Sequence, residues 1–131
     1  DVTAEKIRIY KQLDSLTSEK EIDRMKLQIT DRFGAMPPEL ENLFYVVKVR
    51  NLGASLGFEK IIIKNGLFIC FFISNQMSPY YKSKTFDRVL DSMNEVGNIF
   101  EMKQSEGRLK LVARGVDSME KAYSYLKRIG K

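Results

Sequence analysis

Apolar residues recur with the spacing of an amphipathic helix in three segments of the first 57 positions. The three predicted stripes consist of Ile7, Tyr10, Leu13 and Leu16; of Ile22, Met25, Ile29 and Phe33; and of Leu40, Leu43, Phe44, Val47, Leu52 and Leu56. Thr3 is predicted to cap the first helix and Ser18 the second, where Glu21 completes a capping box. The third helix, about residues 38–56, is apolar around much of its circumference, so we expect it to be buried.

β-Branched and aromatic residues replace the helical pattern in the second half of the chain and predict two hairpins. These hairpins consist of residues 60–64 and 67–73 around Asn65-Gly66, and of residues 99–105 and 108–113 around Glu106-Gly107. The first two strands lack clean alternation, which favours a central position or cover on both faces. The last strand alternates and is expected to be half-buried.

Two further helices complete the predicted elements. A fourth helix, about residues 82–95, follows a loop, and a fifth begins at a capping box over residues 117–120. Their predicted inward residues are Phe86, Val89, Leu90 and Met93, and then Met119, Ala122, Tyr123, Leu126 and Ile129. Because strands joined by tight turns pair antiparallel, the fold class is α+β: three N-terminal helices, then two β-hairpins forming an antiparallel sheet with two further helices packed on it.

The length of 131 residues predicts a single domain, with a helical half at 1–57 and a hairpin-helix half at 58–131. The chain begins at Asp1 without an initiator methionine, from which we infer a fragment of a larger protein. It shows no signal-peptide pattern, and its longest apolar run, residues 67–73, is too short to cross a bilayer. We therefore expect no membrane partner.

Catalytic and metal-binding patterns are missing from the sequence. It contains no histidine, and its one cysteine, Cys70, lies in an apolar run that predicts a small buried side chain. No glycine-rich phosphate loop is present, and the acidic pairs at 19/21 and 39/41 suit the first turns of helices. The sequence therefore predicts no catalytic residue and no metal ligand, which disfavours an independent enzyme.

The net charge of +5 is concentrated in the second half of the chain. Residues 1–57 hold nine basic and nine acidic residues, whereas residues 58–131 hold thirteen basic and eight acidic ones. This excess raises the alternative of a sequence-independent nucleic-acid-binding accessory domain. Aromatic residues on an exposed sheet face would support it, but Phe68, Phe71 and Phe72 are favoured as core residues.

The most specific string of the chain covers residues 31–38, where the second helix ends and the third begins. Gly34 is predicted to end the helix in a left-handed conformation, and Phe33 to pack inward. Pro37 holds the preceding residue extended before the next helix starts. Asp31 lies unfavourably at a helix C-terminus, whereas Arg32 there is favourable. An aspartate in that place suggests a salt bridge or a partner.

The string Asp31-Arg32-Phe33-Gly34, with Pro37 and Glu41-Asn42-Leu43 after it, resembles the C-terminal domain of the bacterial transcription-repair coupling factor, also called the mutation frequency decline protein. The resemblance covers residues 1 to about 58 well and continues in pattern beyond. It implies a multidomain parent, an ATP-dependent DNA translocase that removes stalled RNA polymerase and recruits nucleotide excision repair.

The resemblance also implies what this domain does within such a parent. The domain itself would be non-catalytic and need no cofactor, because ATP and magnesium belong to the motor domains. It would dock on the N-terminal repair-protein-like module, mask the surface that binds UvrA and restrain the motor until released. RNA polymerase and DNA would be indirect partners, and the location would be cytoplasmic.

The family's docking surface includes charged residues at the end of the helix before the Phe-Gly turn. Asp31 and Arg32 match these positions, and Gln28 stands where a glutamate is common. The partner-binding residues implied are therefore Gln28, Asp31 and Arg32, while Phe33, Gly34 and Pro37 would form the structural turn. The other interpretation of Asp31 and Arg32 is local: both would hydrogen-bond backbone groups across the turn.

Overall fold

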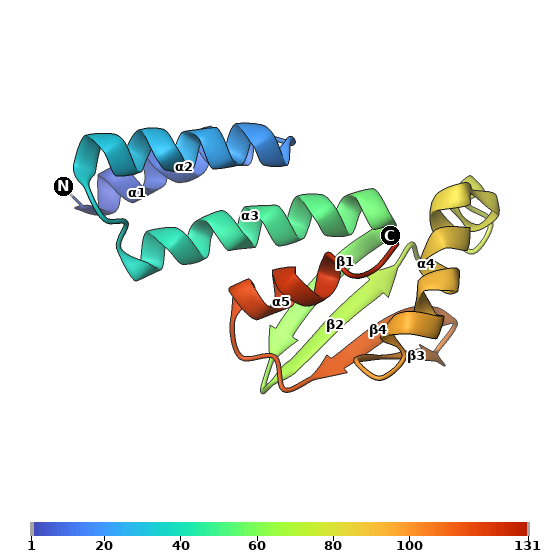
Figure 1. Ribbon diagram of the computed structural model, residues 1–131. Helices are drawn as coiled ribbons and strands as arrows, with labels where there is room; N and C mark the ends of the chain where they lie inside the picture. Colours follow the sequence, from blue (N-terminus) through green and yellow to red (C-terminus); the bar gives the residue numbers. More distant parts are fainter. Residues whose placement is uncertain (1, 131) are drawn as a thin grey trace. The chain divides into compact units, whose positions relative to one another are not determined.

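The structure, a computed structural model, describes residues 2–130, and within that range it contains five α-helices, one 3-10 helix and four strands (Figure 1). In chain order these are α1 (Val2–Asp14), α2 (Glu19–Phe33), α3 (Pro38–Leu56), β1 (Phe58–Lys64), β2 (Leu67–Phe72), the 3-10 helix η1 (Pro79–Lys82), α4 (Lys84–Val96), β3 (Phe100–Ser105), β4 (Arg108–Arg114) and α5 (Met119–Leu126). The predicted α+β class and element order are confirmed. None of the described helices is long and apolar enough to cross a membrane.

The chain forms two compact units, one ending at Asn51 and the other beginning at Leu52. Helix α3 contributes its first part to the N-terminal unit and its last turn to the C-terminal unit. A single domain over residues 1–131 stays a prediction.

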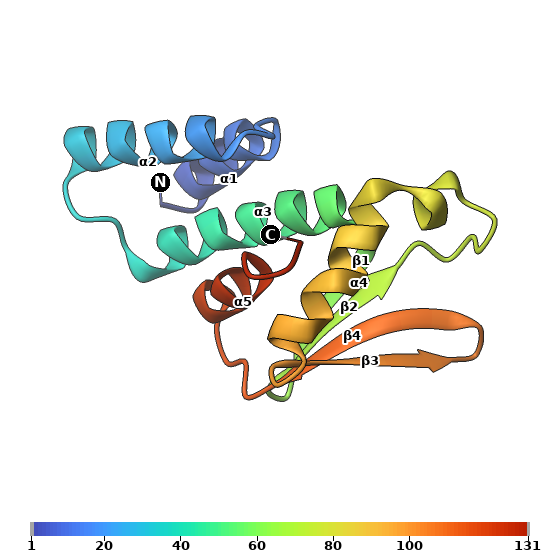
Figure 2. The same ribbon diagram turned by 45° about the vertical axis from the view of Figure 1, so that its right-hand side comes forward.

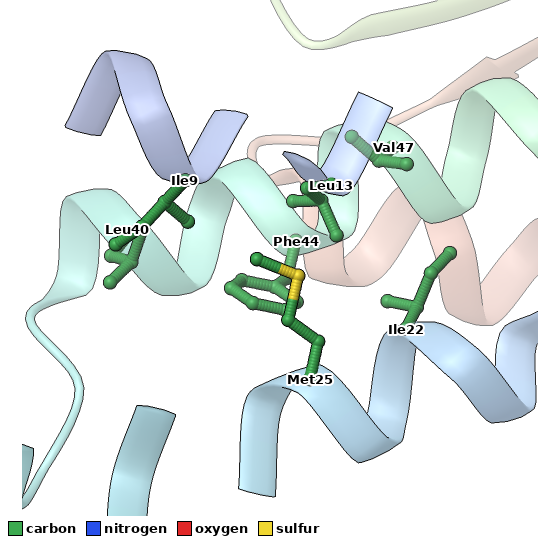
Figure 3. Close-up of a cluster of buried hydrophobic side chains, with 7 residues drawn as sticks. All are labelled: Ile9, Leu13, Ile22, Met25, Leu40, Phe44 and Val47. Carbon is green, nitrogen blue, oxygen red and sulfur yellow. The ribbon is translucent and has the colours of Figure 1, made fainter. Parts of the chain in front are cut away.

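The N-terminal unit is built on an apolar core shared by its three helices (Figure 3). This core consists of Ile9, Leu13, Ile22, Met25, Leu40, Phe44 and Val47. The predicted stripes of α2 and α3 are confirmed at their central positions, and Phe44 is 1% exposed. Removing such side chains from water supplies the main favourable free energy of folding for this unit.

The predicted stripe of α1 is wrong at two positions. Ile7 and Tyr10 are exposed, and Ile9 is buried instead, beside Leu13. Leu13 belongs to both candidate stripes, because Tyr10 precedes it by three residues and Ile9 by four. Only the packing against the other helices selects the Ile9 row. The predicted cap at Thr3 is also wrong, because this residue lies within the first turn of α1.

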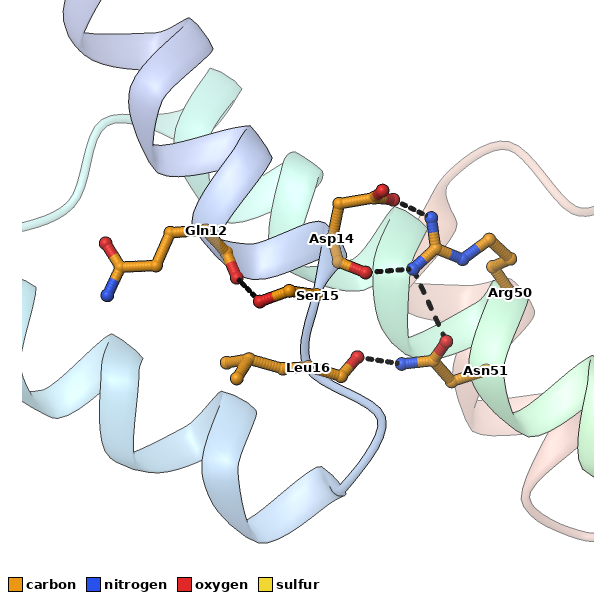
Figure 4. A network of polar contacts seen from close by, with 6 residues as sticks. All are labelled: Gln12, Asp14, Ser15, Leu16, Arg50 and Asn51. Atoms are coloured by element: carbon orange, nitrogen blue, oxygen red, sulfur yellow. Dashed lines mark hydrogen bonds and ion pairs between the residues drawn. The ribbon is translucent and has the colours of Figure 1, made fainter.

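Polar side chains of α3 join this helix to the turn between α1 and α2 (Figure 4). Arg50 pairs with the carboxylate of Asp14, and its Nη2 lies 3.3 Å from the Asp14 carbonyl oxygen. Asn51 donates from Nδ2 to the carbonyl oxygen of Leu16 at 2.9 Å. The cap predicted at Ser18 is confirmed by the 3.4 Å hydrogen bond from the Glu21 amide, which is one half of the predicted capping box. These bonds fix where α2 begins.

We expect Asn51→Ala to cost about 1–2 kcal/mol of unfolding free energy, because it leaves the partly buried Leu16 carbonyl without this donor. Arg50→Ala removes an exposed ion pair and the longer contacts of the same guanidinium with the Asp14 carbonyl oxygen and Asn51, and we expect it to cost about 0.5 kcal/mol. Urea denaturation of both variants checks this order. A larger loss for Arg50→Ala than for Asn51→Ala would contradict it.

The C-terminal unit contains one antiparallel sheet with strand order β1-β2-β4-β3. Both predicted hairpin turns are confirmed, since Asn65, Gly66, Glu106 and Gly107 all have positive φ, as type I′ turns require. Strands β2 and β4 are central, so the predicted central position holds for β2 but is wrong for β1, which is an edge strand.

Helices α4 and α5 cover one face of this sheet (Figures 1 and 2). On that face Phe72 meets Phe86 of α4 with 5.7 Å between ring centroids, and Phe100 meets Tyr125 of α5 at 6.3 Å. Cys70 lies between the buried rings of β2, and burial raises the pKa of its thiol. The buried position predicted for this cysteine is confirmed.

Four details of this unit differ from the predicted pattern. In β4 three consecutive residues, 111–113, are buried, so the predicted half-buried strand is wrong at its centre. Leu90 of α4, which was predicted to point inward, is 39% exposed. That helix begins at Lys84, after a separate 3-10 turn. The cap of α5 is Ser118, which accepts from the Lys121 amide at 3.1 Å.

Candidate functional site

The junction between α2 and α3 is formed by a glycine turn followed by proline. Gly34 ends α2 with φ 85° and ψ −157°, a region that glycine alone occupies readily, and its amide donates to the Thr30 carbonyl at 2.8 Å. The predicted turn at Gly34 is confirmed, although its ψ is extended rather than left-handed helical. Helix α3 then begins at Pro38, and Pro37 accepts from the Glu41 amide at 3.0 Å.

Phe33 does not pack inward as predicted, because 60% of its surface is exposed. Its spacing from Ile22 does place it on the same face of α2, about 20° away after eleven residues. Helix α2 ends at Phe33, however, so no further helical turn follows to cover the ring. The phenyl ring therefore forms the rim of a surface hollow.

Two hollows lie beside this ring within the N-terminal unit. An apolar pocket of about 410 Å³ includes Phe33, Ile9, Ile29, Met36 and Leu40 in its lining. A neighbouring polar groove of about 240 Å³ runs between α1 and α2. Its polar lining consists of Glu5, Arg8, Gln12, Gln28 and Arg32. The exposed Phe33 lines both hollows.

The structure brings Gln28, Arg32 and Phe33 together on one side of α2. Residues four apart lie next to each other on a helix, so Gln28 and Arg32 form one polar row. The guanidinium carbon of Arg32 lies 5.2 Å from the centroid of the Phe33 ring. Asp31 is exposed but lines neither hollow, because each helical residue is rotated by about 100° from the next.

Asp31 and Arg32 do not support the turn by hydrogen bonds in the part of the chain that the structure describes. Within residues 2–130 neither side chain has an ion pair or a hydrogen bond to the backbone at Gly34, and the contact of Arg32 is with the Phe33 ring. Gln28 likewise has no hydrogen-bonded side-chain partner there. The polar groups of all three side chains are therefore open to a partner or to water.

The hollows present guanidinium, amide and carboxylate groups next to apolar surface, which can recognise a mixed polar and apolar protein surface. Among the described residues no three histidine, cysteine or acidic side chains lie close enough to hold a metal ion.

The pocket itself was not predicted from the sequence. Its lining comes from α1, the end of α2 and the start of α3, and no local pattern links Ile9 to Met36 or Leu40. The exposure of Phe33 was missed for the same reason. The one usable signal was the Gly34-to-Pro37 stretch, which ends the helix directly after Phe33 and so removes the next helical turn.

Comparison with known proteins agrees with the resemblance carried by residues 31–43. The chain is 27% identical over 115 residues to the transcription-repair-coupling factor of Rickettsia prowazekii (strain Madrid E), covering 88% of this chain and 10% of that protein. The corresponding factor of Buchnera aphidicola subsp. Acyrthosiphon pisum (strain APS) is 26% identical over 109 residues, covering 79% of this chain and 13% of that protein. The chain thus spans about a tenth of these relatives.

A crystal structure described as the C-terminal domain of transcription-repair coupling factor has the same fold. It aligns with a TM-score of 0.69 and 15% identity, covering 93% of this chain and 76% of that one. The family model of the TRCF domain matches residues 1–83, which include all of the α2–α3 junction. This chain therefore belongs to the TRCF domain family.

Proposed function

We propose that this chain is a non-catalytic regulatory domain of a transcription-repair coupling factor that restrains its parent by docking. In the intact protein it would bind the N-terminal repair-protein-like module through the α2–α3 junction and mask the UvrA-binding surface of that module. The parent would be an ATP-dependent DNA translocase that acts on stalled RNA polymerase. Release of the domain would then expose the repair-recruiting surface.

The observation that carries the proposal is a group of three exposed polar side chains, without hydrogen bonds or ion pairs among the described residues, beside an exposed aromatic ring. Gln28, Asp31 and Arg32 present an amide, a carboxylate and a guanidinium on neighbouring turns of α2. These groups form no bonds that would stabilise the turn. They would gain charge-assisted hydrogen bonds when a partner of opposite charge covers them.

The apolar pocket adds a place for an anchoring side chain. Phe33 is 60% exposed at its rim, and interfaces are enriched in aromatic and arginine side chains at their centres. A partner that inserts an apolar side chain here would also lay a carboxylate against Arg32 and Arg8 in the adjoining groove. The partner surface expected is therefore apolar at one point and acidic next to it.

A mixed polar surface also suits a contact that has to open. When the two modules separate, the charged side chains of the contact would become hydrated again, and no large apolar area would be uncovered. A few kcal/mol of interaction would hold the closed state, and the same amount would have to be supplied to release it.

The test is a charge exchange at the junction. We expect the double variant Asp31→Arg/Arg32→Glu to weaken binding of this chain to the repair-protein-like module about 30-fold or more, because desolvated ion pairs are worth about 2 kcal/mol or more at an interface. Titration calorimetry measures this affinity. In the full-length parent the same exchange is expected to increase UvrA binding and ATP hydrolysis.

The chain offers a matched control. Asp87 and Arg88 form the same dipeptide on α4, and both are exposed. Asp87→Arg/Arg88→Glu makes the same exchange at the same net charge and is expected to leave the affinity within about twofold. If the exchange at residues 31 and 32 changes neither the affinity nor the activities of the full-length parent, the docking role of these residues is wrong.

A further inference from the structure

The sheet of the C-terminal unit has a second face that none of the helices in that unit covers. The helices contact the other face of the sheet: Gly53 of α3 approaches Ile61, Phe86 of α4 meets Phe72, and Tyr125 of α5 meets Phe100. The strand register places all three of these sheet residues on one side. The residues that alternate with them point to the opposite side.

That opposite side is strongly basic. The register brings together six cationic side chains, which we call the basic sheet face: Lys60, Lys64, Lys103, Arg108, Lys110 and Arg114. Two carboxylates, Glu59 and Glu101, reach it from the described strands. Most of the chain's positive excess is therefore gathered on one side of one sheet, although the six residues are scattered over 55 positions of sequence.

Phe71 lies at the centre of this face, half-buried beneath three cations. The guanidinium of Arg108 is 5.0 Å from its ring centroid, and the ammonium groups of Lys60 and Lys110 are each 5.7 Å away. These side chains belong to β1, β2 and β4, so three strands converge on one aromatic ring. Phe71 is thus not a core residue like Phe68 and Phe72, and the sequence-based interpretation of it is wrong.

The acidic side chains leave most of the positive charge uncompensated. Glu59 is held by the Ser74 amide at 3.1 Å, by the Ser74 hydroxyl and by Arg108 at 3.2 Å. The Ser74 amide, its hydroxyl and Arg108 lower the pKa of Glu59. Glu101 lies 3.8 Å from Lys103. At the end of β1 and β4 away from Glu59, the exposed Lys64 and Arg114 have no carboxylate partner among the described residues.

The hydrogen bonding of the Arg108 side chain is also incomplete. Its Nε is buried and has no hydrogen-bond acceptor within the described part of the chain. Its guanidinium carbon lies 5.0 Å from the centroid of the Phe71 ring, and its Nη2 lies 3.2 Å from the Glu59 carboxylate. A planar cation held over an aromatic ring presents a stacking surface for a nucleobase.

We propose that the basic sheet face binds single-stranded nucleic acid without sequence preference. The lysines and Arg114 would contact phosphates, and the Phe71–Arg108 pair would stack a base. The register places Lys60, Lys110 and Lys103 in one row across the strands with Phe71, and Lys64 and Arg114 in a second row four residues, about 14 Å, farther along the strands. Such an array with a central aromatic ring suits a flexible chain of repeating phosphates and bases better than an irregular acidic protein segment.

This face lies entirely within the unit that begins at Leu52 and shares no residue with the α2–α3 junction. It is independent of the docking proposal. The exchange Asp31→Arg/Arg32→Glu is therefore expected to leave nucleic-acid binding unchanged, so that failure of either proposal can be recognised separately.

The test measures fluorescence anisotropy of a labelled oligothymidylate of about 16 nucleotides, with the whole 131-residue chain, between about 50 and 200 mM salt. Binding is expected to weaken steeply with salt. Lys60→Glu/Lys64→Glu/Arg114→Glu is expected to reduce the affinity at least tenfold and to reduce the salt slope by about 2. Phe71→Leu is expected to weaken binding severalfold with the slope retained, because it removes stacking and no charge.

The matched control is Lys84→Glu/Arg88→Glu/Arg128→Glu, which changes three exposed cations of the same unit by the same charge. It is expected to keep at least half of the wild-type affinity. Equal losses in both triple variants, or no binding by the wild type at low salt, would overturn the proposal. Polyglutamate bound as tightly as the oligothymidylate would instead assign the face to an acidic protein, and tighter binding of a duplex of equal length would overturn the single-strand assignment.

A thermal melt shows whether the charge reversals keep the fold. If the first triple variant melts earlier than its control, Lys60→Gln/Lys64→Gln repeats the test without introducing like charges on adjacent strands. That pair is expected to weaken oligothymidylate binding about threefold or more, and unchanged binding by it would contradict the proposal.

Discussion

Phe44→Ala is expected to lower the unfolding free energy of the N-terminal unit by about 3–5 kcal/mol. The side chain is 1% exposed and lies at the centre of the core that α1, α2 and α3 share (Figure 3). A unit of about fifty residues has a total stability of about 3–8 kcal/mol, so this one cavity would unfold a large share of the molecules. Far-ultraviolet circular dichroism during urea titration reports the loss, because this unit holds most of the helix in the chain.

Leu27→Ala is the control for this experiment. Leu27 lies on α2 but is 64% exposed, so its truncation is expected to change the unfolding free energy by about 0.5 kcal/mol or less. A loss below about 1 kcal/mol for Phe44→Ala would show that the core assigned here does not hold the three helices together.

Gly57→Ala is expected to destabilise the C-terminal unit by about 2–5 kcal/mol, the sum of a backbone strain and a steric clash. Gly57 has φ 98°, and a Cβ there would lie 2.1 Å from the Tyr80 ring. The ring cannot move away freely, because its hydroxyl donates to the Leu56 carbonyl at 2.5 Å. It also packs against Phe86, with 5.3 Å between the ring centroids. Calorimetric melting of the variant measures the effect.

The variant Gly115→Ala separates the backbone strain from the steric clash. The φ of Gly115, 71°, is also positive, but a Cβ there would meet no atom within 4 Å. Gly115→Ala is therefore expected to cost only the strain, about 1–2 kcal/mol. Equal losses in the two alanine variants would contradict the steric role of Tyr80 at Gly57.

The consequences for function differ between the two variants. Phe44 belongs to the unit that carries Gln28, Asp31 and Arg32, whereas Gly57 belongs to the unit that carries the basic sheet face. We expect Phe44→Ala to weaken docking more than nucleic-acid binding, and Gly57→Ala to do the reverse. This difference follows if each unit keeps its own core.

The parts of this protein that the sequence predicted well are those with local physical causes. Asn65-Gly66 specifies a tight turn because both residues tolerate positive φ, and the observed φ values of 53° and 77° agree. Ser18 caps the start of α2 and Gly34 caps its end, each through a hydrogen bond to a group within four residues. The string from Asp31 to Pro37 carried the resemblance to the family, and Gly34 and Pro37 are the residues in it that form the turn.

Errors arose where the outcome depended on which other element lies opposite. Ile9 and Tyr10 are both apolar enough for the inner face of α1, and only the packing of α2 and α3 chose Ile9. Phe33 has the spacing of a buried residue, but its helix ends where no further helical turn is left to cover it. Periodicity gives the direction of a side chain and not the presence of a neighbour.

By itself the sequence determined the α+β order of elements, both hairpin turns, the helix end at Gly34 and the family to which the chain belongs. Only the tertiary structure decided that Phe33 opens onto a pocket, that Asp31 and Arg32 have no ion pair or hydrogen bond to the turn within residues 2–130, and that six scattered cations share one sheet face with Phe71. The reason is physical: turns and caps are set by bonds within a few residues, whereas pockets and charged faces form from residues that strand pairing and helix packing bring together across the chain.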